Sequence, residues 1–331
     1  MCYNQIMKRL YYATFESGFG EVVKKIIKKT DRNSQVKTMD DDSVLFFADE
    51  HFKFVDSCFI EAFVVIQNVH KTGVGALNMT IKTILERKDL KLGLPKDEGT
   101  VKFTIKKENE NVAVDVKLKT AFEVMIKKIT KKGISFFAKS ELVLLSKKTG
   151  DNLFMRRVQT ENKTIGRETK YDFRPETAYM LCFMSEPQPN EVVLDAMGTN
   201  GIIAYVRALS FAKANVIVAT ADEDDQERCK KLAKKLKNDT FSILKYDYLE
   251  DNFPIKFIDK IVTDLTGFGY GRIDTFKGFF EKSFDLKIKT IVVALPKNQD
   301  NKRFFADKYD ILTEVIANKF VAYKLKLKTE E

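Results

Sequence analysis

Four acidic residues follow four apolar segments in the second half of the chain, at spacings typical of a nucleotide-binding sheet. They are Asp195, Asp222, Asp247 and Asp264. Carboxylates at the carboxyl ends of parallel strands accept hydrogen bonds from ligand hydroxyl and amino groups. We therefore expect Asp222 to accept from a ribose hydroxyl and Asp247 from an adenine amino group.

The first acid opens a glycine-containing turn, Asp195-Ala-Met-Gly-Thr-Asn-Gly201. Gly198 and Gly201 permit a tight turn and a close approach of backbone to ligand. Each acid taken alone could instead be a helix cap or a turn residue. Their placement after successive strands favours a shared site. The turn lacks a full Gly-x-Gly-x-x-Gly, which argues against an NAD-dependent dehydrogenase.

The elements that position these residues alternate between short apolar strands and helices. Strands are predicted at residues 192–194, 215–220, 241–246, 260–263 and 290–295, with a final hairpin at 311–317 and 320–327. Helices are predicted at 176–184, 201–211, 225–237 and 276–284. This alternation predicts an α/β fold with a mostly parallel, doubly wound sheet.

The first half also mixes strands and helices. Strands are predicted at residues 9–15, 43–48, 61–69, 100–106, 111–118 and 136–146, and helices at 20–29, 76–86 and 122–131. Residues 152–170 are polar and carry few hydrophobic anchors, so they indicate a domain junction. We therefore expect one domain over residues 1–160 and a second over 161–331.

Charge is distributed unevenly between the halves. The chain of 331 residues has a net charge of +10, with 32 basic and 22 acidic side chains in residues 1–170 and 25 of each in the remainder. A basic half ahead of a neutral one suits a polyanionic substrate held by its phosphates, although lysine-rich helix faces could serve solubility alone. We predict RNA as the partner.

The positions of the cysteines and histidines argue against a disulfide-rich protein and a zinc protein. The cysteines (Cys2, Cys58, Cys182, Cys229) are scattered without a Cys-x-x-Cys pair, and the histidines are His51 and His70. This spacing fits neither a disulfide framework nor a zinc site. No apolar run is long enough to cross a bilayer. We expect a reduced, cytoplasmic protein without metal or membrane association, as a monomer or weak dimer.

Three motifs carry a resemblance to a known family. They are Phe173-Arg-Pro-Glu-Thr-Ala-Tyr-Met-Leu181, the turn from Asp195 to Gly201, and Asp264-Leu-Thr-Gly-Phe-Gly269. They resemble the entry helix "L-R-P-x-x-A-x-x-L", the turn "D-P-x-C-G-S/T-G" and the catalytic motif "D-P-P-Y/W-G" of THUMP-type class I S-adenosylmethionine (SAM) RNA methyltransferases. Members of this group methylate the exocyclic N2 of guanine in tRNA and related RNAs. The resemblance implies a Rossmann-like methyltransferase sheet preceded by a ferredoxin-like and THUMP-like α+β module.

The resemblance also implies roles for individual residues. SAM would be bound by Asp195, Gly198, Gly201, Asp222 and Asp247. Asp264 would hold the target amine, and Phe268 or Tyr270 would stack on the base. From their positions in the chain, Arg174, Arg156 and Arg157 could contact the RNA backbone; Arg174 could instead brace the entry helix, and the other two could lie in a solvated linker.

Departures in two of the family's motifs leave alternatives open. In the turn from Asp195 to Gly201, Ala196 replaces a proline and Thr199 a glycine, and after Asp264 both prolines are absent. A catalytically degenerate paralogue that only binds RNA is therefore a second hypothesis. A third is a SAM enzyme acting on a small molecule or a protein, which the segregated basic charge argues against.

Overall fold

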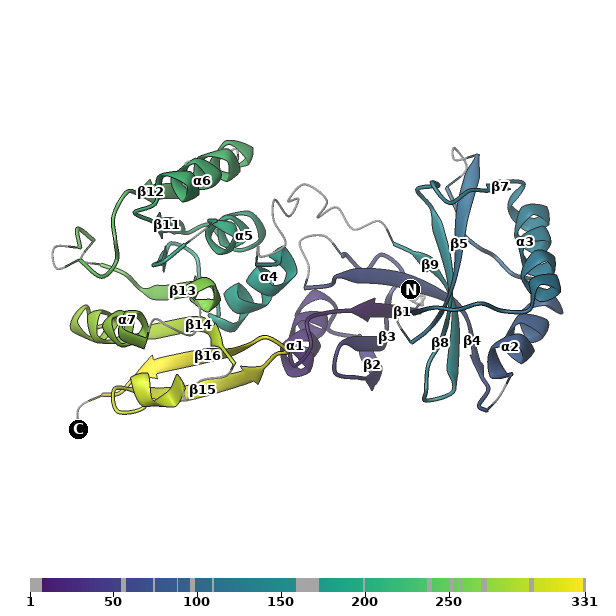
Figure 1. Ribbon diagram of the computed structural model, residues 1–331, viewed down its shortest axis with the longest axis horizontal. Helices are drawn as coiled ribbons and strands as arrows, with labels where there is room; N and C mark the ends of the chain where they lie inside the picture. The colour runs from purple at the N-terminus through teal and green to yellow at the C-terminus, as the bar shows by residue number, and fades with distance from the viewer. Residues whose placement is uncertain are drawn as a thin grey trace, which may run out of the picture.

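The computed structural model contains two β-sheets, one in each half of the chain (Figure 1). It describes residues 8–54, 58–73, 75–87, 89–95, 99–108, 110–158, 173–198, 200–236, 240–250, 253–255, 257–268, 273–297 and 301–329. Among these residues, no helix combines the length and apolar character that crossing a bilayer requires.

The first sheet has nine strands in the order β2-β3-β1-β4-β9-β8-β5-β6, with β7 beside β5. The strands are β1 (Lys8–Thr14), β2 (Gln35–Met39), β3 (Ser43–Asp49), β4 (Glu61–His70), β5 (Thr100–Lys107), β6 (Glu110–Asn111), β7 (Gly133–Ile134), β8 (Glu141–Ser146) and β9 (Asp151–Arg157). The helices are α1 (Gly20–Thr30), α2 (Ala76–Leu85) and α3 (Val116–Thr130). The predicted α+β character of this half is confirmed.

Two predicted strands in this half are wrong or too long. Of residues 111–118 only Asn111 lies in a strand, at the end of β6, and α3 already begins at Val116. Asp115 caps that helix, its carboxylate accepting a hydrogen bond from the Leu118 amide over 3.0 Å. The predicted strand at 136–146 is confined to β8, which starts at Glu141.

The second sheet is mostly parallel, as predicted. Its strands are β10 (Val192–Asp195), β11 (Asn215–Ala219), β12 (Phe241–Leu244), β13 (Lys260–Asp264), β14 (Thr290–Pro296), β15 (Tyr309–Ile316) and β16 (Phe320–Leu327). Their spatial order is β12-β11-β10-β13-β14-β16-β15, and β16 runs antiparallel to β14. Numbered within this sheet, the order is 3-2-1-4-5-7-6. The order reverses beside β10, so a crevice at that point is the expected ligand site.

Helices cover both faces of this sheet. They are α4 (Pro175–Met184), α5 (Ile202–Ser210), α6 (Glu223–Lys235) and α7 (Ile273–Asp285), with short 3-10 helices at Thr266–Phe268 and Asn301–Phe304. Side chains alternate between the faces along each strand. In β14, Val292 packs in the core with α4, α5 and α6, while Ile291 and Val293 pack in the core with α7.

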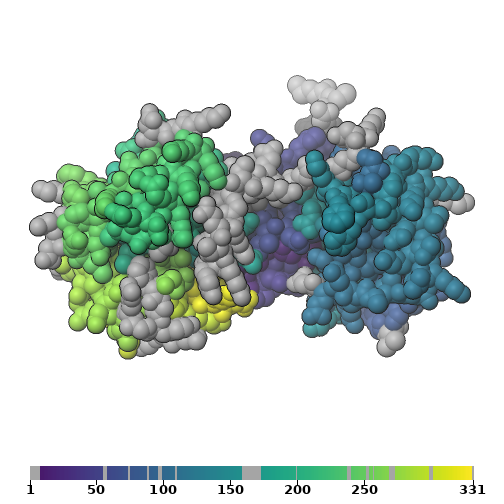
Figure 2. All heavy atoms as spheres, turned by 45° about the horizontal axis from the view of Figure 1, so that its top comes forward, coloured from purple at the N-terminus to yellow at the C-terminus, as the bar shows by residue number. Residues whose placement is uncertain are grey.

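One hydrophobic core crosses from the first half into the second. It joins buried residues of α1, β1 and β3 to buried residues of α4, α5 and β16. The ring of Phe19 lies 6.1 Å from that of Phe320, measured between centroids. Figures 1 and 2 show the N-terminal segment, in purple, between the C-terminal sheet and the rest of the first half. The two sheets are therefore joined by packed apolar side chains.

A glycine permits the closest part of this contact. Gly18 has a φ of +87°, and a Cβ added to it would lie 2.2 Å from the backbone oxygen of Ile316. Only glycine can adopt this conformation and leave that space open. The α1 layer is thereby held directly against the β15–β16 hairpin.

Candidate functional site

Asp195 lies at the end of β10, where it is almost completely buried. Its side chain is 3% exposed, and its Oδ1 accepts a hydrogen bond from the hydroxyl of Thr263 over 2.8 Å. The same hydroxyl accepts from the Met197 amide over 3.4 Å. Burial raises the pKa of Asp195 to about 7, and the charge of Asp264 adds to the rise while Thr263 opposes it. Asp195 thus braces the first strand-to-helix turn from behind.

The two glycines of this turn serve close packing. A Cβ on Gly198 would lie 2.4 Å from a methyl group of Val218 and 2.8 Å from Oδ2 of Asp195. Gly201 has a φ of +67° and precedes α5, and its Cβ would lie 2.6 Å from the sulfur of Cys229 on α6. Gly198 therefore brings the turn against β11, and Gly201 brings α5 against α6. Thr199 lies outside the described residues.

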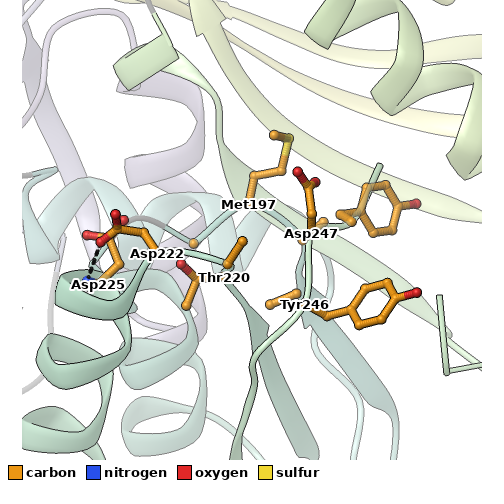
Figure 3. Close-up of a pocket in the computed structure, with 11 residues that line it drawn as sticks. Met197, Thr220, Asp222, Asp225, Tyr246 and Asp247 are labelled. Carbon is orange, nitrogen blue, oxygen red and sulfur yellow. Dashed lines mark hydrogen bonds between the residues drawn. The ribbon is translucent and has the colours of Figure 1, made fainter. Parts of the chain in front are cut away.

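A cavity of about 260 Å³ opens at the carboxyl ends of β10, β11 and β12. Its lining residues are Ala196, Met197, Gly198, Ala219, Thr220, Ala221, Asp222, Asp225, Tyr246, Asp247 and Tyr248. Figure 3 shows Asp222 on one side and Asp247 on the other, with Met197 and Thr220 between them. Of the predicted cofactor residues, Gly198, Asp222 and Asp247 line this cavity, whereas Asp195 and Gly201 support it from outside.

The two carboxylates on the wall retain hydrogen-bonding capacity. Asp222 is the N-cap of α6, and its Oδ1 accepts from the Asp225 amide over 3.0 Å. Oδ1 of Asp247 accepts from the Leu249 amide over 2.9 Å. A carboxylate has about four acceptor positions. One bond to the backbone fixes each side chain and leaves positions for ligand hydroxyl or amino groups.

Several lining residues were not predicted from the sequence. Met197 and Tyr246 are partly buried and add apolar and aromatic surface next to the acids. Tyr248 is fully buried, with its hydroxyl 2.9 Å from the Ser283 hydroxyl, so it anchors the segment after β12 to α7. The signal in the sequence is that tyrosines flank Asp247 on both sides. An apolar wall with a few acceptors suits a flat heterocycle that carries polar groups.

Asp264 lies at the end of β13, beside β10 and β14. Its Oδ1 accepts a hydrogen bond from the Thr266 amide over 2.8 Å, which turns the chain into the short helix at 266–268. Burial raises the pKa of Asp264 to about 6. Asp264 does not line the cavity, but it lies at the same edge of the sheet. The side chain of Phe268 lies outside the described part of the chain.

The three predicted RNA-contacting arginines differ in their surroundings. Arg157 bonds Glu141 over 2.7 Å and Glu61 over 2.8 Å, so two carboxylates already engage its guanidinium. Arg156 is half-buried on the same strand, and burial lowers its pKa, as does the positive charge of Arg9. Arg174 starts α4, with NH1 3.9 Å from the Glu16 carboxylate.

These environments rank the three side chains as partners for a phosphate. Arg174 has a side chain that is 37% exposed, and its ion pair with Glu16 is long at 3.9 Å. A phosphate could join that pair, whereas the guanidinium of Arg157 already engages two carboxylates over 2.7 and 2.8 Å.

Three solved structures match the fold of this protein over almost the whole chain. TrmN from Thermus thermophilus matches with a TM-score of 0.78 at 11% identity, over 97% of this chain and 100% of that one. A possible methylase from Clostridium difficile 630 matches with a TM-score of 0.73 at 12% identity, over 98% and 99% of the two chains. SMU.472, a candidate methyltransferase complexed with SAH, matches with the same TM-score, identity and coverage.

No protein-family model matches the chain, and no curated protein is similar to it in sequence. The likeness is therefore one of fold. The chain has the predicted Rossmann-like class I methyltransferase sheet, preceded by an α+β half.

Proposed function

We propose that this protein is a SAM-dependent methyltransferase that acts on RNA. The observation that carries the proposal is the cavity between Asp222 and Asp247, at the point where the order of the 3-2-1-4-5-7-6 sheet reverses. Solved structures of the same fold include methylases, and one of them was crystallised with SAH.

The cavity has the chemistry that SAM requires. Its volume is close to the lower end of small-molecule sites, about 300 to 1,000 Å³. Asp222 would accept from the ribose hydroxyls and Asp247 from the adenine amino group, while Met197 and Tyr246 would contact the adenine ring. A Cβ at Gly198 would collide with Val218 and Asp195, so glycine at this position lets the turn lie against β11 at the wall of the cavity. When bound, SAM supplies an electrophilic methyl group, so the protein needs mainly to align the acceptor atom.

For the acceptor we propose an exocyclic amino group, guanine N2 in tRNA. Such a nitrogen is a poor nucleophile because its lone pair is conjugated with the ring. Asp264 would accept one of its N–H groups and thereby localise the lone pair. Phe268 would supply the stacking face. Support for an RNA substrate comes from the positive excess, all of which lies in residues 1–170.

In this proposal the two halves of the chain have different functions, and the boundary between them lies near residue 160. The first half would act as a ferredoxin-like and THUMP-like RNA-binding module, and the second as the catalytic domain. Arg174 is the arginine whose surroundings best suit a phosphate contact.

Two measurements test the proposal separately. Calorimetric titration of SAH into the wild type and into Asp222→Asn measures ligand binding in the cavity. We expect the wild type to bind SAH saturably and the substitution to weaken binding. An assay for transfer of a labelled methyl group from SAM to unmodified tRNA transcripts measures catalytic activity. An absence of SAH binding to the wild type would sink the proposal.

A non-catalytic RNA-binding paralogue is the second candidate. It is favoured by the hydrogen bond that ties the Asp264 carboxylate to the Thr266 amide, in a loop without the family's two prolines. It predicts tight RNA binding, with SAH binding intact or lost, and no methyl transfer to any RNA. The transfer assay separates the two candidates.

A further inference from the structure

We propose that Phe136 and Phe137, with the lysines around them, form a docking surface for unpaired nucleotides of RNA. The inference rests on the proposed RNA substrate and adds the residues that would hold it away from the cavity. The two side chains are 78% and 91% exposed. Two neighbouring phenylalanines held this far into solvent do not contribute to the core.

The turn that presents the rings is fixed by hydrogen bonds. The Ser135 amide donates to the Val101 carbonyl over 3.0 Å, which anchors the turn to β5. The Phe137 amide donates to the Ser135 hydroxyl over 3.2 Å. The ring centroids of Phe136 and Phe137 are 5.8 Å apart, with their planes at 86°. Two nearly perpendicular faces are thus offered by an ordered backbone.

The sequence around the rings is rich in lysine. Residues 124–140 contain five lysines and no acidic residue. Four of these lysines, Lys127, Lys128, Lys131 and Lys139, are exposed. The ammonium of Lys102 lies 5.1 Å from the centre of the Phe136 ring and 3.2 Å from the Glu141 carboxylate. A cation is therefore already held against one of the rings.

This combination suits single-stranded nucleic acid. Base stacking on exposed aromatic rings and phosphate contacts with lysines together account for most sequence-tolerant binding of single strands. In a duplex the faces of the bases are already stacked, so the rings would not contribute. Figure 1 places α3 and β7 at the end of the molecule opposite the C-terminal sheet, which leaves room for an extended strand.

An anionic lipid surface shares part of this chemistry, because aromatic rings and lysines also bind membrane interfaces. RNA is favoured because lysines occur at both ends of α3, Lys117 and Lys119 at its start and Lys127 and Lys128 in its last turn, with Glu123 between them 4.0 Å from Lys119. A helix of 15 residues is about 22 Å long. Basic residues spread over that length suit a phosphate backbone, whereas a loop that anchors to a membrane needs charge only around its tip.

The test uses the full chain and a fluorescein-labelled, unstructured RNA of about 12 nucleotides. Fluorescence polarisation compares the wild type with the double variant Phe136→Ala/Phe137→Ala. We expect the double variant to bind at least about fivefold more weakly, with the slope of log affinity against log salt unchanged. Lys131→Glu/Lys139→Glu should reduce that slope.

Phe257→Ala is the matched control, because this phenylalanine is 85% exposed in the second half of the chain. It should bind the single strand as the wild type does. Phe136→Tyr/Phe137→Tyr keeps the rings and should restore binding. A blunt-ended RNA duplex should bind the wild type and the double alanine variant equally.

Three outcomes would overturn the inference. The double alanine variant could bind the single strand as tightly as the wild type, or it could lose binding to single strand and duplex alike. It could also lose binding only to vesicles that contain phosphatidylserine. Titration with SAH distinguishes failure of this inference from failure of the methyltransferase proposal. If the protein binds SAH but its RNA binding does not depend on the two rings, only this inference is wrong. If RNA binding depends on the rings but SAH does not bind, only the methyltransferase proposal is wrong.

Discussion

The hydroxyl of Thr263 on β13 donates a hydrogen bond to the Asp195 carboxylate on β10 over 2.8 Å, and both side chains are buried. The two strands are parallel neighbours at the centre of the second sheet. This bond joins the end of the first strand to the strand that carries Asp264, so it couples the floor of the cavity to the candidate catalytic loop.

Replacing Thr263 by valine should destabilise the protein by about 1 to 3 kcal/mol, because it removes one of the hydrogen bonds to the buried Asp195 carboxyl group. Urea denaturation measures the free energy of unfolding. Thr263→Ser keeps the hydroxyl and should cost less. A valine variant as stable as the wild type would show that the bond contributes nothing.

Stability should depend on pH through Asp195. An unfolded aspartate has a pKa of about 3.9, whereas burial raises that of the folded Asp195 to about 7. Between these values the unfolded chain releases its proton while the folded chain keeps it. The free energy of unfolding should therefore fall as the pH rises from about 4 to about 7.

Asp195→Asn does not titrate and still accepts from Thr263, so its stability should fall less over this range. One unit of pKa shift corresponds to about 1.4 kcal/mol, and the whole effect amounts to a few kcal/mol. Urea melts at pH 4, 5, 6 and about 7 measure it. Equal slopes for the wild type and the variant would contradict the assignment. Asp264→Asn is the companion variant, because the pKa of Asp264 is raised to about 6.

Asp222→Asn should weaken SAH binding by about tenfold or more, because an amide replaces a charged acceptor at the wall of the cavity. The substitution keeps an oxygen for the helix cap, so the fold should be little affected. Calorimetry gives the dissociation constant. Asp224→Asn, an exposed acid of α6 outside the cavity, serves as the control and should bind normally.

Gly198→Ala should lower stability by about 1 to 3 kcal/mol, since the new methyl group would lie 2.4 Å from Val218. Gly267→Ala provides a matched comparison in the same half. A Cβ there meets nothing within 4 Å, so the free energy of unfolding should change by about 0.5 kcal/mol or less. Equal melting temperatures for the two variants would refute the packing argument.

Much of the fold could be predicted from periodicity. The strands of the second sheet were predicted to within a few residues, because short apolar runs bounded by turns are typical of buried parallel strands. The edge strand β2 was missed, since its residues are mostly exposed and show no apolar alternation. The helix predicted at 122–131 begins six residues earlier in the structure, at Val116, where the Asp115 side chain caps it. The predicted polar junction at residues 152–170 is wrong for its first part, because Leu153, Phe154 and Met155 are fully buried in β9, between β4 and β8.

The candidate site could be predicted only in part, because sequence spacing does not show contacts between distant segments. Asp222 and Asp247 could be placed from their position after strands, and both line the cavity. Asp195 has the same sequence signal, yet it is buried behind the turn. Its partner Thr263 lies on a strand 68 residues further along the chain, so spacing alone could not show the hydrogen bond between them. Which way a strand-end carboxylate turns depends on its neighbours in the sheet.

The hydrophobic core shared by α1, α4 and β16 makes the two halves one thermodynamic unit. A ligand that binds only the folded cavity lowers the population of every state in which that core is open. Backbone amides of α1, in the other half of the chain, should then exchange with deuterium more slowly when the cavity is filled. Occupancy of the cavity can thus be sensed in the N-terminal half without any movement of one sheet against the other.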